Sequence, residues 1–257
     1  MFHRTVVLAV FTSILSLSGV AQRMAARIAE PSRENSTPQL QKATQPRSAE
    51  VPDAHISVAR LRVPGKAWRL YEGAITAWIR HDPRKAQHQL EKALQIDPQF
   101  PEALTLNAFM HATRQQWGYA EQSLQAAIQC DPGFAPAYVV LAGVYNAQSR
   151  FDDAQRATQQ AVSTGATAWP LQYEIARSLI GKGEYERALA VTDAALRSGH
   201  APLLRLAKAH ALLGLRRYAA AVDQLRGFLH DQPSGDGSQE ARDLLQRVTA
   251  LSHSDGE

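Results

Sequence analysis

The stretch EKALQIDPQFPEALTL, residues 91–106, decides the fold, because a close copy of it, QAAIQCDPGFAPAYVV, occupies residues 125–140. Ala, Gln, Asp, Pro, Phe and Ala stand at the same places in both copies, so that Ala93 in the first is matched by Ala127 in the second. A fixed step of roughly 20–50 residues is typical of a chain that builds one structural unit several times. The sequence therefore predicts a stack of similar units.

Small residues keep this step through most of the chain. One series is Ala86, Ala120, Ala154, Ala188 and Ala221, a second is Ala74, Ala108, Ala142, Ala176 and Ala209, and a third is Ala93, Ala127, Ala161 and Ala195, followed by Phe228. Three residues before each member of the first series stands Pro83, Trp117, Phe151, Tyr185 or Tyr218. Two helices can approach closely only where their side chains are small. The series predict where paired helices cross.

Each unit is long enough for two antiparallel helices of about 13 residues with short turns. Neither helix can bury its apolar face alone, so the units must stack. Pro98 and Pro132 follow an Asp and are expected to end second helices, whereas Pro136 and Pro170 are expected near the starts of first helices. We predict five pairs over residues 66–234, a capping helix over 237–252 and a disordered tail over 253–257.

These features resemble the tetratricopeptide repeat family. The likeness runs from Lys66 to about Pro233 and is carried by the small series, the aromatic series ending at Tyr218, and the phrases GKGEYERALAVTDAAL (residues 181–196) and QHQLEKALQIDP (residues 87–98). It implies an all-α, right-handed superhelical solenoid of five antiparallel helix pairs with a C-terminal capping helix. The family's early aromatic is replaced here by Leu70, Leu104, Gln172 and Arg205 in four units, and Tyr138 stands in the other.

The N-terminal part has a different composition. Residues 1–22, MFHRTVVLAVFTSILSLSGVAQ, place one Arg before an uncharged run and end on small residues, which predicts a signal peptide over 1–21 and a periplasmic or secreted protein. The uncharged run is marginal for spanning a hydrocarbon core of about 30 Å, so an uncleaved anchor facing the periplasm stays open. Residues 22–55 predict a disordered tether, and Ile56, Val58, Leu61 and Val63 predict an extended lead-in over 56–65.

The sequence offers no pattern of a catalytic or metal site. Its net charge of +4 is mild, and acids alternate with bases, which disfavours a nucleic-acid binder. A single cysteine excludes an internal disulfide. No histidine pair has the spacing of a helical zinc site, and no nucleophile or phosphate-loop motif occurs. We predict no enzyme, cofactor or metal, and an unrecognised active site remains the open alternative.

The family resemblance implies a concave groove lined by the first helix of each repeat. The corresponding residues here are Trp68, Tyr71, Ile75, Arg80, Thr105, Phe109, Val139, Asn146, Tyr173, Arg177, Ile180, Leu206 and His210. Their mainly apolar character suits an extended or helical peptide with hydrophobic anchors. Some of them could instead pack against neighbours. The family's carboxylate clamp is absent, since its positions hold residues such as Tyr71, Ile75 and Val140.

Two functional hypotheses follow. The first is a non-catalytic protein–protein interaction scaffold of the cell envelope that binds a peptide or partner protein in this groove. The alternative is a structural or assembly subunit of envelope machinery that is tethered to the membrane or self-associates.

Overall fold

The computed structural model describes residues 62–199, 201–235 and 237–254, where all regular structure is helical. Ten helices form consecutive pairs: α4 (Gly65–Ile79) with α5 (Pro83–Ile96), α6 (Pro101–Thr113) with α7 (Trp117–Cys130), α8 (Ala135–Ala147) with α9 (Phe151–Ser163), α10 (Trp169–Gly181) with α11 (Tyr185–Ser198), and α12 (Pro202–Gly214) with α13 (Tyr218–Asp231). One more helix, α14 (Ser238–Ser254), packs against α13. The prediction of an all-α stack of helix pairs is confirmed.

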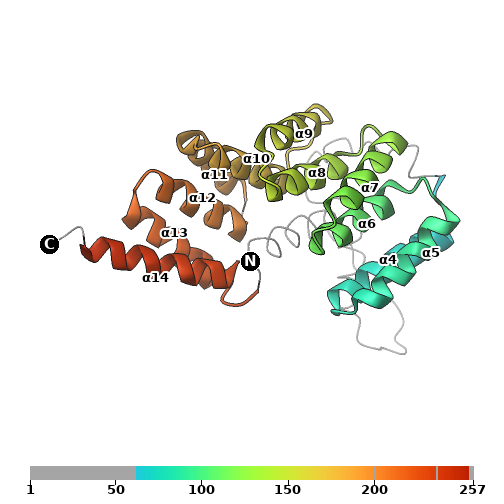
Figure 1. Cartoon of the computed structure of the whole chain (residues 1–257), viewed down its shortest axis with the longest axis horizontal. Helices are drawn as coiled ribbons and strands as arrows, with labels where there is room; N and C mark the ends of the chain where they lie inside the picture. The colour runs from blue at the N-terminus through green and yellow to red at the C-terminus, as the bar shows by residue number, and fades with distance from the viewer. Residues whose placement is uncertain (1–61, 200, 236, 255–257) are drawn as a thin grey trace, which may run out of the picture.

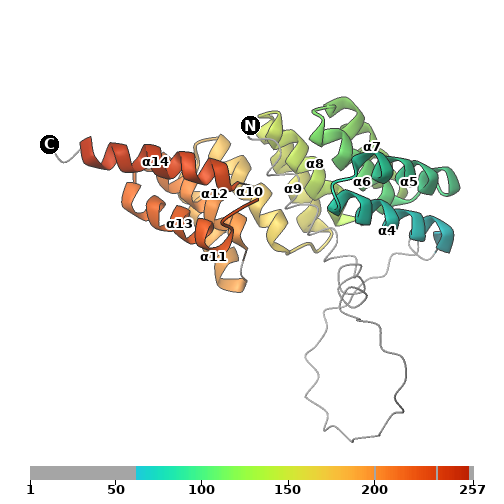
Figure 2. The same cartoon turned by 90° about the horizontal axis from the view of Figure 1, so that it is seen from below.

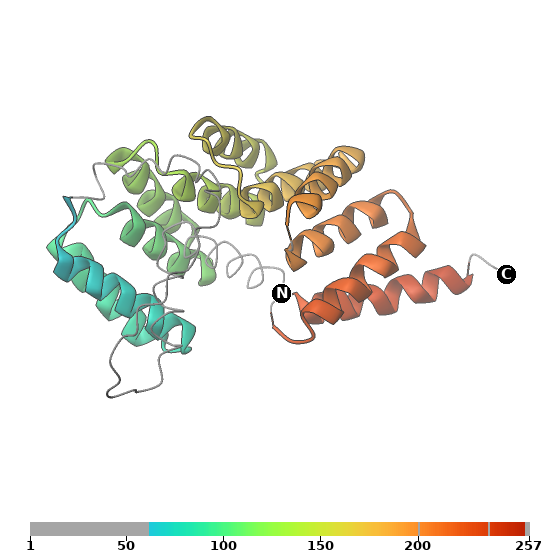
Figure 3. The same cartoon turned by 180° about the vertical axis from the view of Figure 1, so that it is seen from behind.

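The pairs follow one another along an arch, with the first helix of each pair toward its inner side (Figure 1). Neighbouring first helices contact each other, α6 with α8, α8 with α10 and α10 with α12. Seen from below, the row runs from α4 and α5 at one end to α14 at the other (Figure 2). The opposite face of the arch shows the same order (Figure 3). Side chains from different repeats therefore lie along one continuous inner strip.

The small residues lie where the sequence places them. All members of the first two alanine series are fully buried, as is Phe228, which replaces alanine in the third. The residue three positions before each alanine of the first series is the first residue of a second helix, from Pro83 in α5 to Tyr218 in α13. The close contact between paired helices thus repeats at the predicted step.

Every first helix ends in the same hydrogen-bonded turn. In the third repeat, Ser149 N donates to Asn146 O and Arg150 N donates to Tyr145 O, which is the Schellman pattern. The pattern needs one residue in the left-handed region, and His81, Gln115, Ser149, Gly183 and Arg216 adopt it with φ between 57° and 76°. Only Gly183 adopts this conformation without steric cost.

Proline and aspartate set the other boundaries. Asp97 and Asp131 end α5 and α7, and each side chain accepts a hydrogen bond from the backbone N–H two residues later, at Gln99 and Gly133. Pro136 and Pro170 lie in the first turns of α8 and α10, as expected. A fixed proline φ suits that position, and the missing N–H would be unpaired there in any case.

Some predictions fall beyond the described ranges. The signal peptide, the tether and residues 56–61 of the lead-in lie outside them, and α4 begins at Gly65. At the other end, α14 continues to Ser254, two residues past the predicted capping helix and into the predicted disordered tail. Within the part that the structure describes, no helix has both the length and the apolar character to cross a membrane.

Candidate functional site

The predicted groove residues lie on the first helices, apart from Arg80, which caps the C-terminus of α4. Eight of them are buried, namely Tyr71, Ile75, Thr105, Phe109, Val139, Asn146, Tyr173 and Leu206. Four are half-buried, namely Trp68, Arg177, Ile180 and His210, and Arg80 is exposed. A partner approaching the inner strip would first meet the half-buried and exposed members of this set.

Aromatic rings form the part of the strip at α4 and α6. The Trp68 ring meets the ring of Tyr71 edge-on, with centroids 5.7 Å apart, and that of Phe100 at 4.7 Å. Trp78 meets Phe109 edge-on at 5.5 Å, which joins α4 to α6. Such edge-to-face pairs add about 0.5–1.5 kcal/mol each beyond simple burial. The first two repeats therefore share a rigid aromatic cluster, in which Trp68 and Trp78 are the partly exposed rings.

A buried polar cluster joins α8 to α10. Asn146 Nδ2 donates to Glu174 Oε2 and to the Glu174 backbone oxygen, both at 2.9 Å. Arg177 Nη1 donates to the same Glu174 Oε2 at 2.8 Å, and its guanidinium lies 5.7 Å from the Tyr173 ring centroid. A carboxylate inside a protein is stable only when it is paired and hydrogen-bonded. The two hydrogen bonds from Asn146 to Glu174 thus hold the third and fourth repeats together at the strip.

Two oxygen atoms in this cluster stay unsatisfied. Among the described residues, neither Glu174 Oε1 nor Asn146 Oδ1 accepts a hydrogen bond, and both atoms are buried. Gly143 lies close to Glu174, since a Cβ atom added to Gly143 would be 3.2 Å from Glu174 Oε1. Unpaired acceptors in a low-dielectric site cost free energy.

Burial shifts the titration of this cluster. It raises the pKa of the Glu174 carboxyl, and the nearby Arg177 charge and the Asn146 hydrogen bond offset part of that rise. Burial also raises the pKa of the Tyr173 hydroxyl, with a smaller opposing effect from Arg177. Tyr173 is therefore neutral across the physiological range.

His210, the last predicted groove residue, lies at the end of the stack. Its Nε2 atom is 2.8 Å from Glu240 Oε1 on α14, so the capping helix contributes to the strip beside α12. This pairing joins helices 30 residues apart in the chain.

Sequence reasoning missed Glu174, Trp78 and Glu240. Glu174 directly follows a predicted groove residue, Tyr173. At the equivalent position the other repeats have Leu106, Val140, Ala207 and one other acid, Glu72. An acid among apolar counterparts could have marked the position. Nothing in the sequence indicates that Asn146 is its partner.

The described residues contain no group of three or more His, Cys, Asp or Glu that could hold a metal ion. Cys130 is half-buried at the end of α7, and burial, followed by the charges of Asp97 and Asp131, raises the pKa of its thiol. That shift disfavours the reactive thiolate at neutral pH.

Comparison with known proteins supports the fold. No protein-family model matches the chain, and no curated protein sequence matches it. Among solved structures, the thermophilic TPR protein TTC0263 of Thermus thermophilus is 22% identical with a TM-score of 0.62, over 72% of this chain and 97% of its own. PilW, described as a widely conserved type IV pilus biogenesis factor, is 13% identical with a TM-score of 0.61, over 73% and 92%.

A third similar structure belongs to the APC/C hetero-tetramer Cut9–Hcn1. It is 18% identical with a TM-score of 0.67, and the match covers 74% of this chain but 38% of that one. At these identities the likeness concerns the fold. Together with the repeated alanines, the identical turns and the arch of paired helices, it shows that the chain has the fold of a tetratricopeptide repeat protein.

Proposed function

We propose that the protein is a non-catalytic interaction scaffold of the cell envelope, and that it binds a peptide or partner protein along the inner strip of its first helices. The observation that carries this proposal is the cluster between α8 and α10. It places the half-buried Arg177 guanidinium beside the Tyr173 ring, at a face where successive repeats meet. A peptide offers carbonyl and carboxylate oxygens, which are the acceptors that a guanidinium binds.

The aromatic end of the strip suits the same ligand. Trp68 is half-buried at the N-terminal end of α4 and braced by Phe100, so it presents a fixed apolar surface. Aromatic anchors with polar groups nearby are typical of the centres of protein interfaces. The envelope location rests on the sequence of residues 1–22.

Two proteins with a similar fold have described roles. Cut9 occurs in a hetero-tetramer with Hcn1, and PilW is a pilus biogenesis factor. The fold does not fix the function, but these roles agree with an interaction scaffold.

Site-specific photo-crosslinking tests the proposal. A photoreactive phenylalanine derivative replaces Trp68 or Ile180 on the inner strip, or the exposed Glu91 or Gln125 on α5 and α7, and the cells are irradiated intact. We expect a discrete protein adduct from the first two sites and none from the control sites. Adducts only from the control sites, or from no site, would refute binding along the strip.

The alternative is a membrane-tethered or self-associating subunit of envelope machinery. The uncharged run of residues 5–22 and the exposed Ile79 and Tyr119 favour it. N-terminal sequencing of the mature protein distinguishes an anchored chain from a released one. Light scattering at several concentrations then measures self-association, and a monomer that lacks the first segment would exclude this alternative.

A further inference from the structure

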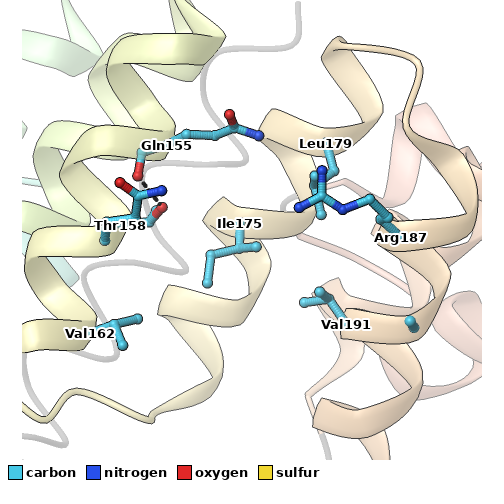
Figure 4. A pocket seen from close by; sticks show the side chains of 9 residues that line it. Gln155, Thr158, Val162, Ile175, Leu179, Arg187 and Val191 are labelled. Atoms are coloured by element: carbon cyan, nitrogen blue, oxygen red, sulfur yellow. Dashed lines mark hydrogen bonds between the residues drawn. The ribbon is translucent and has the colours of Figure 1, made fainter.

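A cleft of about 460 Å³ opens between α9 and α11, on the second helices rather than on the inner strip. Figure 4 shows Ile175 and Leu179 of α10 between the side chains of the two flanking helices. Val162 and Val191 add apolar surface, and Val162 is 52% exposed. Gln155, Thr158 and Gln159 form a polar part of the wall on α9. A cleft of this size accepts several side chains of a ligand.

The cleft arises because bulk is missing from one series of the repeat. At the same place in the second helices the chain holds Leu90, Leu124, Thr158, Thr192 and Leu225. Thr158 lines the cleft and uses its hydroxyl to donate to Gln155 O on its own helix. In the first, second and fifth repeats the leucine at this position is fully buried.

One charge stands at the cleft. Arg187 is the only ionisable residue of the lining, and its side chain is 70% exposed. Its ion-pair partner is Glu184, three residues earlier in the chain. Exposed pairs of this kind contribute little in water, so the guanidinium can exchange Glu184 for another carboxylate at small cost. The lining therefore combines an apolar floor with a cationic edge.

We propose that this cleft is a second docking site, which binds a peptide segment of a partner protein carrying aliphatic side chains and a carboxylate within one turn. The aliphatic groups cover Val162, Ile175 and Val191, and the carboxylate pairs with Arg187. The site faces away from the inner strip, so it is independent of the function proposed above.

Selection from a phage library of random 16-residue peptides against the full-length protein tests this inference. Recovered peptides are remade with a fluorescein label, and fluorescence anisotropy measures their dissociation constants. Ala190→Phe fills the cleft from an exposed position on α11, and Arg187→Glu reverses its charge. We expect a class of aliphatic, acidic peptides whose binding weakens at least tenfold in both variants.

Each variant has a matched control. Ala220→Phe adds the same ring at an exposed site of α13. Arg156→Glu changes an arginine that is 71% exposed and paired three residues away with Asp153, but that does not line the cleft. Both controls should bind the peptides as the unchanged protein does. If Ala190→Phe does not fold, the loss of peptide binding in Arg187→Glu still tests the proposed site.

Three results would overturn the inference. One is a selection that yields no peptide sensitive to either cleft variant. Another is a cleft-dependent class that is basic rather than acidic. The third is equal weakening in Arg187→Glu and Arg156→Glu, which would assign the effect to net charge. Peptides that bind the inner strip are recognised separately, because they respond to Ile180→Glu and not to Ala190→Phe.

Discussion

At the junction of the second and third repeats, Ile128 and Phe134 pack against one hydrophobic cluster, whereas at the junction of the third and fourth repeats the same positions hold Val162 and Ala168. Val162 is largely exposed, and neither it nor Ala168 belongs to a cluster of the described core. The larger pair packs into its junction, whereas Val162 lines the open cleft between α9 and α11. Equal spacing of repeats therefore does not give equal packing.

The turns that end the second helices at these two junctions, α7 and α9, also differ. α7 ends at Asp131, whose side chain accepts a hydrogen bond from Gly133 N before Phe134 enters the core. α9 ends instead in a Schellman turn, with Gly165 at φ 86° and Ala166 N donating to Ala161 O. The aspartate turn is followed by a large side chain and the glycine turn by small ones. On the side of the second helices, the junction of the third and fourth repeats is therefore expected to open more readily than the junction of the second and third.

The largest predicted effect tests whether leucine closes the earlier junction. Leu124→Thr copies the residue of the third repeat into α7 and should lower the free energy of unfolding by about 3 kcal/mol, because it removes buried methyl groups and leaves a cavity. Urea denaturation followed by circular dichroism measures it. Val162→Thr, at the open junction, should change stability by less than about 0.5 kcal/mol. Equal losses in the two variants would mean that both junctions are packed alike.

The second prediction concerns the polar cluster on the inner side of the open junction. Burial raises the folded-state pKa of Glu174 above its unfolded value, so its contribution to stability is greatest below the unfolded pKa and is lost as pH rises through the folded pKa. Glu174→Gln, whose amide can donate to Asn146 Oδ1, should be more stable than the unchanged protein at pH 7, because the neutral amide avoids the cost of burying a charge.

The pH dependence separates this effect from simple repacking. The advantage of Glu174→Gln should shrink as the pH falls toward 4, when urea midpoints are compared at each pH. Glu186→Gln, on the exposed side of α11, should show no such trend. An advantage that grows toward acid pH would contradict the assigned cause.

The third prediction fills the open junction. Thr158→Leu copies the residue of the first, second and fifth repeats to the wall of the cleft. It should raise the free energy of unfolding by about 1 kcal/mol, since the added methyl groups enter existing space. It should also weaken the cleft-dependent peptides. Destabilisation would show that Thr158 is already fully packed and that the cleft is not a consequence of its size.

The smallest effect compares the turns that end α8 and α10. Ser149 and Gly183 occupy the same left-handed position, with φ of 59° and 76°. Ser149→Gly should stabilise by about 0.5 kcal/mol, because relief of strain exceeds the entropy that glycine gains on unfolding, and Gly183→Ala should destabilise by about 1 kcal/mol. Thermal unfolding of both variants measures the difference. Loss of stability in Ser149→Gly would mean that the serine is unstrained.

The sequence predicted the features that depend on spacing along the chain. Alanine recurring at a constant step, as from Ala86 to Ala120, identified the helix crossings, since no larger side chain fits there. The contact of Asn146 with Glu174 could not be predicted, because it depends on the rotation between repeats. The replacement of leucine by Thr158 is visible in the sequence, but whether neighbours collapse into the missing volume is a property of the packed structure. The sequence left open whether predicted groove residues such as Tyr71 line the groove or pack against neighbours, for the same reason.

Native-state hydrogen exchange of the full-length protein, read by mass spectrometry, tests the inequality of the junctions most directly. Segments covering residues 126–146 and 160–180 are compared in the same sample. The packing described above predicts lower protection, and so a smaller opening free energy, for the later segment. Equal protection, or lower protection at residues 126–146, would contradict it.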